Sequence, residues 1–324
     1  MTRILRIGTR GSPLALWQTR QVQGLLESRS GRTEIVEVTT TGDVIQDVPL
    51  ARLRSSALFS AELDQALLAG RIDFAVHSLK DLPTTLPPGV EIAAVSARAD
   101  PRDALVGRGP LRWDEVPQGA AIATCSLRRR AQLLRARPDL RVVEIRGNID
   151  SRITRLDRTS GWTATILAVA GLVRLGLTAR IGERLPFELM LPAPGQGALA
   201  VTVRAGDGAS SALARSAVHD ENTALCVAAE RALLGRLEGG CEVPVGAHAR
   251  LIEQSGTRSL EITGRVVSLE GRESVEQRQT APAADTAAAA ALGIALADQL
   301  LESGAASILQ QVRAATARVE TVDP

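Results

Sequence analysis

Residues 124–155 read TCSLRRRAQLLRARPDLRVVEIRGNIDSRITR and carry nine arginines between short apolar runs. The pattern predicts a helix over 127–137, a strand over 141–145 and a second helix over 148–157. A further strand is expected just before this stretch, at 120–124. Strands and helices that alternate over such short connections indicate an α/β fold with a doubly wound, mainly parallel sheet.

Arginine is almost the only basic residue, because Lys80 is the single lysine among 38 Lys and Arg. The planar guanidinium pairs with carboxylate or phosphate through two parallel hydrogen bonds. Arg128 and Arg129 follow a Thr-Cys-Ser turn at a predicted helix N-terminus, where anions bind and cations are otherwise disfavoured. The stretch is therefore a candidate anion site. The alternative is a set of solvated charges, which explains Arg135 and Arg137 well.

The composition limits the class of protein. A chain of 324 residues with 45% hydrophobic and 23% charged residues fits two or three globular domains. With 2% aromatic residues, no tyrosine and a net charge of +2, it lacks the features of a base-stacking nucleic-acid binder. The N-terminus is unlike a signal peptide, and no run approaches the roughly 18 apolar residues of a membrane span. We expect a cytoplasmic enzyme.

The N-terminal half repeats the alternation of strand and helix. Residues 4–7 form a predicted strand, after which Ser12 can cap a helix that has Pro13 at its first position. Residues 74–76 form another predicted strand, which ends at HSLKDLP. Ligands bind such sheets at the carboxyl ends of the strands. The residues that fall just after predicted strands are Arg10, Ser12, Lys80, Asp81, Arg128 and Arg146.

The pattern changes after residue 208. A long amphipathic helix is predicted there, then an antiparallel meander and two alanine-rich helices. These elements indicate a smaller α+β domain at the C-terminal end. Their predicted ranges are 221–237 for the first helix, 245–251, 259–268 and 273–280 for the strands, and 287–301 and 305–318 for the last helices.

Two residues have both a chemical and a plain interpretation. Asp81 could form a local surface pair with Lys80, or it could stabilise a developing cation beside a cationic site. Cys241 follows two glycines between a helix and a strand, so it could be an attachment or nucleophile site, or an incidental thiol. Cys226 lies on an apolar helix face and is expected in the core. The three cysteines, with Cys125, have neither disulfide nor zinc spacing, and no metal site is expected.

Eight segments of this chain resemble, in order, those of the porphobilinogen deaminase family. They span residues 6–241, and their number makes the resemblance specific. The segments are RIGTRGSPLA at 6–15, AVHSLKDLP at 75–83, DPRDA at 100–104, SLRR at 126–129, RGN at 146–148, LAVAGL at 167–172, LPAPGQGA at 191–198 and LEGGC at 237–241.

The resemblance implies three domains. Two are doubly wound α/β lobes like those of a periplasmic binding protein, expected at 1–98 with 198–218 and at 99–197. The third, at 219–324, is a smaller α+β domain with an antiparallel sheet that carries Cys241. The family also leads us to expect a cytoplasmic monomer whose partner is porphobilinogen, with no nucleic acid and no membrane.

The activity implied is that of a transferase, hydroxymethylbilane synthase, in tetrapyrrole biosynthesis. Four porphobilinogen molecules are joined in turn, each with loss of ammonia, to a dipyrromethane cofactor. The family holds this cofactor by a thioether, here at Cys241. Water finally releases 1-hydroxymethylbilane. Each pyrrole carries an acetate and a propionate, so the growing chain is a polyanion for which arginines are the matching partners.

The resemblance also assigns roles to single residues, with Asp81 as the catalytic residue. Cofactor binding is assigned to Cys241, Lys80, Ser12, Thr124, Ser126, Arg128, Arg129, Arg146 and Gln196. Substrate binding is assigned to Arg10, Arg152 and Arg174. The chain departs from the family at 52–59, where relatives often have glycines and a lysine. We expect Arg54, less surely Arg52, to take over the role of that lysine. The alternative is that both arginines face solvent.

Two other classes of protein remain open at this level. A non-catalytic anion-binding protein of the same two-lobed fold would have no covalent cofactor. A nucleic-acid binder would use the arginine cluster, against which the near-neutral net charge and the scarce aromatic residues argue.

Overall fold

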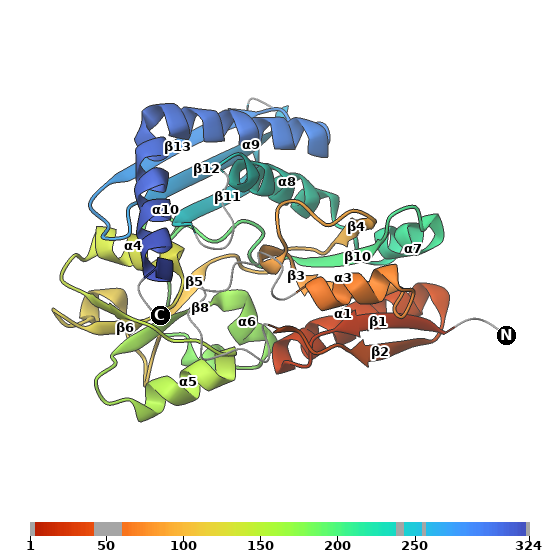
Figure 1. Cartoon of the computed structure of the whole chain (residues 1–324), viewed down its shortest axis with the longest axis horizontal. Coiled ribbons are helices and arrows are strands. Elements are labelled where there is room, and N and C mark those ends of the chain that lie inside the picture. The colour runs from red at the N-terminus through yellow and green to blue at the C-terminus, as the bar shows by residue number, and fades with distance from the viewer. Residues whose placement is uncertain (1–3, 42–59, 238–242, 255–256, 322–324) are drawn as a thin grey trace. The chain divides into compact units, whose positions relative to one another are not determined.

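The computed structural model describes residues 4–41, 60–237, 243–254 and 257–321 (Figure 1). These residues form two compact units. The first comprises 4–41, 60–99 and 196–224, and the second comprises 100–195 and 225–321. The division into three domains stays a prediction, although the C-terminal part of the second unit has a hydrophobic core of its own.

The first unit is built on a five-stranded sheet in the order β2-β1-β3-β10-β4. Four of its strands point the same way, and β10 lies antiparallel between β3 and β4. The strands are β1 (Leu5–Thr9), β2 (Thr33–Glu37), β3 (Phe74–Ser78), β4 (Val90–Val95) and β10 (Leu199–Arg204).

The second unit contains a similar sheet in the order β7-β6-β8-β5-β9, in which β5 is the reversed strand. In both sheets the reversed strand is the first one after the chain has crossed between units. The predicted α/β class with mainly parallel sheets is confirmed, whereas the reversed strands were not predicted. The strands are β5 (Asp103–Gly107), β6 (Ala121–Ala123), β7 (Arg141–Val143), β8 (Ala164–Ala168) and β9 (Glu183–Arg184).

Helices connect the strands, and serines cap two of them, of which the cap at Ser12 was predicted. The Ser12 hydroxyl accepts the Ala15 N–H at 3.3 Å, and Ser126 accepts the Arg129 N–H at 3.4 Å. Each hydroxyl satisfies one of the backbone donors left open in a first helical turn. The helices are α1 (Pro13–Ser30), α3 (Ala61–Leu68), α4 (Leu127–Ala136), α5 (Ile149–Arg158), α6 (Val169–Arg174) and α7 (Gly208–Val218), and short 3₁₀ turns cover Leu79–Asp81, Trp113–Glu115 and Thr178–Arg180.

The C-terminal part contains the predicted antiparallel meander β11-β12-β13. Leu233, Ile262 and Leu296 belong to the core that forms between this sheet and its helices (Figure 1). Cys226 is 7% exposed in the same core, which confirms its expected place. The elements are α8 (Glu221–Arg236), β11 (Val245–Gln254), β12 (Thr257–Val267), β13 (Ser274–Ala281), α9 (Thr286–Leu300), a π turn (Leu301–Ala305) and α10 (Ala306–Thr321).

One helical stretch in the described residues, Thr286–Ala315, is long and apolar enough to cross a membrane by length and composition. From the sequence alone, no apolar run of that length was expected. In its apolar window 44% of the residues are buried inside the protein. Gly304 has φ 110° and breaks the stretch where α9 passes into α10. Its buried side chains, such as Leu296 and Leu309, pack in the core of the antiparallel sheet.

His77 is a buried polar residue in the middle of the first sheet. Its Nε2 lies 3.0 Å from the Thr202 hydroxyl on the neighbouring strand β10. Burial, and to a lesser degree the positive charge of Arg10, lowers the pKa of His77 to about 4. The imidazole is therefore neutral in the folded protein at the pH of the cell.

This burial predicts how stability changes with pH. The unfolded chain takes up a proton at His77 near pH 6.5, while the folded protein does so only near pH 4. The free energy of unfolding should therefore fall by about 2 kcal/mol from His77 alone between pH 7.5 and pH 5. Urea denaturation of the wild type and His77→Gln at both pH values measures this, with His219→Gln as the control. An equal pH dependence in His77→Gln would contradict the assignment.

Candidate active site

The residues assigned to the first sheet lie where its parallel strands end, a side of the sheet that we call its carboxyl edge. β1 and β3 are adjacent and parallel, so the residues that follow them meet at the same end of the sheet. Arg10 and Ser12 follow β1, and Lys80 and Asp81 form the turn after β3. The start of β10 pairs with the end of β3, which brings Gln196 to this edge as well.

Lys80 and Gln196 are in direct contact. The Lys80 Nζ donates to Gln196 Oε1 at 3.2 Å, and the Gln196 carbonyl accepts from Arg98 Nε at 2.9 Å. The next residue, Gly197, has φ 95°, and a Cβ there would lie 2.5 Å from the Ala99 carbonyl oxygen. Only glycine allows the backbone at 197 to lie this close to the backbone at Ala99, and this close packing fixes the chain beside Gln196.

Asp81 is half-buried on the 3₁₀ turn after β3. Within the described residues its carboxylate has no hydrogen bond or ion pair, so the local pair with Lys80 does not form. A carboxylate held on a rigid turn without a partner can receive a positively charged group of a ligand.

The residues assigned to the second sheet also follow adjacent parallel strands. Thr124 and Ser126 come after β6, Arg146 comes after β7, and Arg174 ends the helix after β8. The Arg152 Nε donates to the Gly147 carbonyl at 2.7 Å, which ties α5 to the loop that carries Arg146. Burial lowers the pKa of Arg174 to about 10, so this arginine stays charged at neutral pH.

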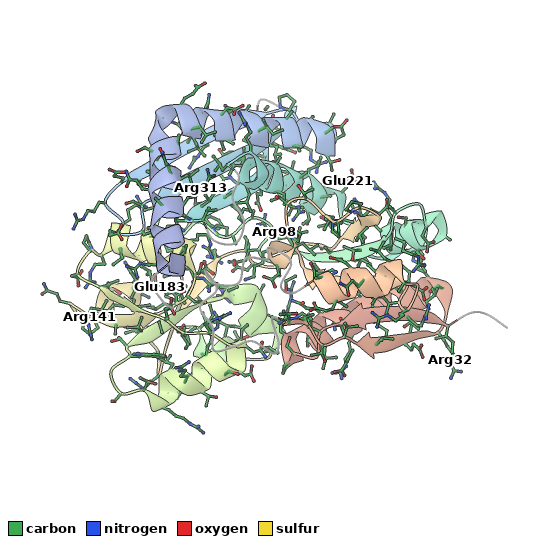
Figure 2. The ribbon with its side chains drawn as sticks, viewed as in Figure 1. Arg32, Arg98, Arg141, Glu183, Glu221 and Arg313 are labelled. Atoms are coloured by element: carbon green, nitrogen blue, oxygen red, sulfur yellow. The ribbon has the colours of Figure 1, made fainter. Side chains whose placement is uncertain are left out.

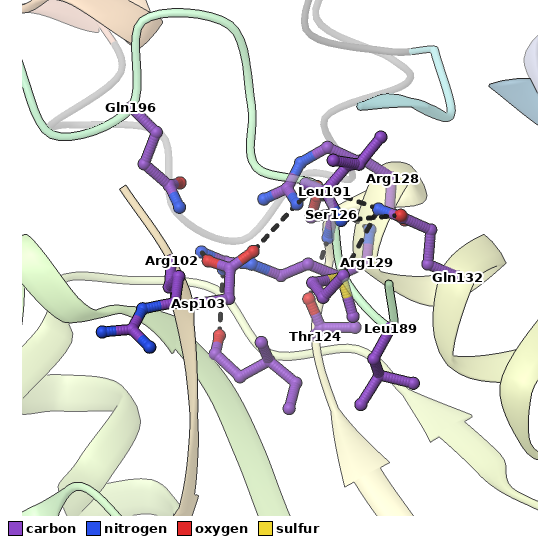
Figure 3. Close-up of polar contacts among 12 residues, drawn as sticks. Arg102, Asp103, Thr124, Ser126, Arg128, Arg129, Gln132, Leu189, Leu191 and Gln196 are labelled. Atoms are coloured by element: carbon purple, nitrogen blue, oxygen red, sulfur yellow. Dashed lines mark hydrogen bonds and ion pairs between the residues drawn. The ribbon is translucent and has the colours of Figure 1, made fainter. Parts of the chain in front are cut away.

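Arg128 and Arg129 share one buried carboxylate, that of Asp103 at the start of β5 (Figure 3). Arg128 Nη1 donates to Asp103 Oδ2 at 2.8 Å, and Arg129 Nη2 donates to Oδ1 at 2.8 Å. The three residues, named here the Asp103 triad, are at most 6% exposed. Further bonds run from Arg128 Nη1 to the Leu191 carbonyl at 2.6 Å and from Arg129 Nη1 to the Ile166 carbonyl at 2.9 Å.

The charges of the Asp103 triad determine its protonation. Burial alone would raise the pKa of Asp103, but the charges and hydrogen bonds of Arg128 and Arg129 lower it below its ordinary range. The carboxylate is therefore ionised, and the triad keeps a net charge of one positive unit. Three buried arginine donors of 124–155, Arg129 Nε, Arg135 Nε and Arg146 Nη1, have no hydrogen-bond partner among the described residues. Unsatisfied buried donors cost free energy, so they favour an incoming acceptor.

Arg137 and Arg141 fit the solvated alternative better. Arg141 is exposed and points away from the ribbon (Figure 2). Arg137 pairs with Asp139 at 2.7 Å at the surface. Arg135 is half-buried: it donates to the Glu188 carbonyl, and its Nε is buried without a partner among the described residues. The sequence reading assigned no role to Asp103. Its one signal was a charged residue directly before the apolar strand ALVG, in a position that burial would penalise without a partner.

Some expected positions lie outside the described residues. These are Cys241, in 238–242, and Arg52 and Arg54, in 42–59. In the part of the chain that is described, no group of three or more His, Cys, Asp or Glu is arranged to hold a metal ion.

Comparison with known proteins gives consistent matches. A family model described as "Porphobilinogen deaminase, dipyromethane cofactor binding domain" matches residues 5–212, and "Porphobilinogen deaminase, C-terminal domain" matches residues 224–302. The porphobilinogen deaminase of Rubrobacter xylanophilus is 49% identical over 311 residues, covering 95% of this chain and 97% of the relative. That of Desulforudis audaxviator is 48% identical over 316 residues, covering 97% and 99%.

Solved structures overlap more weakly. The methionine-binding protein MetQ gives a TM-score of 0.43 at 12% identity, covering 66% of this chain and 89% of that chain. The periplasmic binding protein STM4351 of Salmonella typhimurium gives 0.36 at 13% identity, covering 66% and 91%. At this level of overlap we draw no conclusion from either structure.

The Asp103 triad predicts a large effect on stability. In Asp103→Asn two buried guanidinium charges lose their counter-ion, which costs about 3–5 kcal/mol in comparable buried pairs. The free energy of unfolding from urea denaturation measures the loss. Asp157→Asn is the matched control, because Asp157 pairs with Arg180 at the same 2.8 Å but is 42% exposed. Equal effects of the two substitutions would show that the triad is not a buried ion network.

Proposed function

Because the chain belongs to the porphobilinogen deaminase family, we infer that it is a hydroxymethylbilane synthase, a transferase of tetrapyrrole biosynthesis. It condenses four porphobilinogen molecules with loss of ammonia and releases 1-hydroxymethylbilane by hydrolysis. The structural observation that best supports this function is that Arg129 Nε and Arg146 Nη1, in segments that follow strands of the second sheet, are buried donors without a hydrogen-bond partner among the described residues. Pyrrole acetate and propionate groups supply the acceptors that these donors lack.

We propose that the second unit binds the carboxylates of cofactor and substrate. The described residues fit a dipyrromethane group. The unsatisfied guanidinium donors of Arg129 and Arg146 and the hydroxyls of Thr124 and Ser126 all follow the adjacent parallel strands β6 and β7. The residues proposed to bind these carboxylates in the second unit are Thr124, Ser126, Arg128, Arg129, Arg146, Arg152 and Arg174.

We propose that the first unit provides the catalytic carboxylate, Asp81. Loss of ammonia from porphobilinogen breaks a carbon–nitrogen bond and leaves a cation delocalised over the pyrrole nitrogen. A carboxylate without a protein partner can stabilise that charge and accept a hydrogen bond from the pyrrole N–H. Lys80, Gln196, Ser12 and Arg10 lie at the same edge, where they can hold neighbouring carboxylates of cofactor and substrate.

The dipyrromethane cofactor, when bound, supplies the free α-carbon to which the first porphobilinogen is joined. We propose that Cys241 holds it through a thioether, since this cysteine ends the family-matching segment LEGGC. We also propose that the enzyme works as a cytoplasmic monomer, without nucleic acid or membrane. The non-catalytic anion-binding alternative is not favoured, because it has no use for a family-matching cysteine or for the open carboxylate of Asp81.

The attachment site can be tested by mass. We expect the purified protein to be heavier than its sequence by two linked pyrrole units, and Cys241→Ser to lack this increment because the nucleophilic sulfur is gone. Cys226→Ser is the control and should keep it. Intact mass spectrometry of protein from a host that makes tetrapyrroles decides the point. An unmodified wild-type mass, or an adduct on Cys226, would overturn the assignment.

The role of Asp81 can be tested separately. Asp81→Asn removes the charge but keeps the shape, so the cofactor should still be attached while turnover falls by about 10²–10³. Steady-state formation of hydroxymethylbilane by protein of confirmed mass gives the rate. Asp150→Asn, at an exposed position on α5, serves as the control. A near-normal rate in Asp81→Asn would remove this residue from the mechanism.

A further inference from the structure

Gln132 lies one helical turn after Arg128 on α4, and every polar atom of its amide is occupied (Figure 3). The amide nitrogen donates to the Leu191 carbonyl at 3.0 Å and to the Arg128 carbonyl at 3.3 Å. The amide oxygen accepts the Leu191 N–H at 2.9 Å and Arg265 Nη1 at 2.7 Å. Gln132 is 1% exposed, so water does not compete for these bonds.

Arg265 reaches Gln132 from β12, in the C-terminal sheet. It is 2% exposed, and its Nη2 also donates to the Glu188 carbonyl at 3.0 Å while its Nε pairs with Glu276. A guanidinium group can only donate hydrogen bonds. The Gln132 amide oxygen must therefore face Arg265, and the amide nitrogen must face the Leu191 carbonyl. Arg265 thus selects one of the two orientations of the amide.

The Leu191 carbonyl connects this pair to Arg128. Gln132 holds both polar groups of Leu191, and the same carbonyl accepts from Arg128 Nη1 at 2.6 Å. Arg128 Nη1 therefore has both of its hydrogens engaged, one by Leu191 and one by Asp103. The guanidinium is planar, so fixing Nη1 also fixes the direction of its Nε–Nη2 edge. Among the described residues that edge has no hydrogen-bond partner, which leaves it open to a carboxylate.

The hairpin between β12 and β13 holds α4 at a second place. Arg130 Nε donates to the Leu269 carbonyl at 3.3 Å. Gly271 has φ 73°, and a Cβ there would lie 2.2 Å from the Arg135 backbone nitrogen. The hairpin backbone therefore touches the helix backbone directly. Both contacts come from the C-terminal sheet, and both act on the helix that carries Arg128 and Arg129.

We propose that Gln132 and Arg265 are positioning residues, which aim the open edge of Arg128 at a carboxylate of the dipyrromethane cofactor or of porphobilinogen. This inference rests on the role of Arg128 set out under the proposed function. In this proposal the C-terminal sheet and its β12–β13 hairpin hold α4, the helix that carries Arg128 and Arg129, in place.

The test uses Gln132→Met, which keeps the shape of the side chain, and Arg265→Lys, which keeps the charge but cannot reach all partners at once. In both variants we expect the KM for porphobilinogen to rise about tenfold, the effect of losing one aligned hydrogen bond, while kcat changes less than about twofold. Arg250→Lys is the matched control, an arginine of the same sheet that is 59% exposed and pairs with Glu261. It should leave KM unchanged.

A double substitution separates positioning from a merely structural role. If Gln132 acts through Arg128, Gln132→Met should raise KM no further in an Arg128→Lys background. An equal rise in both backgrounds, or a lower urea midpoint with unchanged KM, would overturn the inference. If Gln132→Met fails to fold, Arg265→Lys with Arg128→Lys gives the same comparison. A normal KM and normal cofactor content in Arg128→Lys alone would instead refute the proposed role of Arg128, and this inference with it.

Discussion

Arg128 and Arg129 share the carboxylate of Asp103 in a place that water barely reaches. Three charges so deeply buried are tolerable only if their hydrogen bonds are well formed, because the cost of removing each from water is several kcal/mol. This requirement fixes three distant pieces of chain. They are the start of β5, the carbonyl of Ile166 on β8 and the carbonyl of Leu191 after the last strand of the second sheet. The directions of the Arg128 and Arg129 side chains depend on this alignment.

The same triad sets the electrostatic character of the edge. One carboxylate between two guanidinium groups leaves a single excess positive charge, and it holds both groups rigid before any ligand arrives. A rigid donor loses less conformational entropy on binding than a long side chain that moves freely in water. At the end of the first sheet, Asp81 adds a carboxylate on the 3₁₀ turn that also carries Lys80.

Local features of the fold could be read from the sequence, and distant pairings could not. Ser12 was predicted as a helix cap because a cap depends on the few residues that follow it. The strands β1 and β3 could likewise be placed from short apolar runs. Asp103 and Arg128 are 25 residues apart, and they meet only because β5 runs against its neighbours. Gln132 and Arg265 are 133 residues apart, and no local pattern in the sequence connects them.

The glycine at the tip of the β12–β13 hairpin has a consequence for sequence divergence. Hairpin tips are usually where proteins tolerate insertions and where tags or new domains can be added. Here Gly271 lies against the backbone of α4, and any side chain would have to push the helix or the hairpin aside. Packing against α4 therefore limits which residues this loop can accept, although the loop is far from α4 in the sequence. An engineer who wants a permissive insertion point in this chain should look elsewhere.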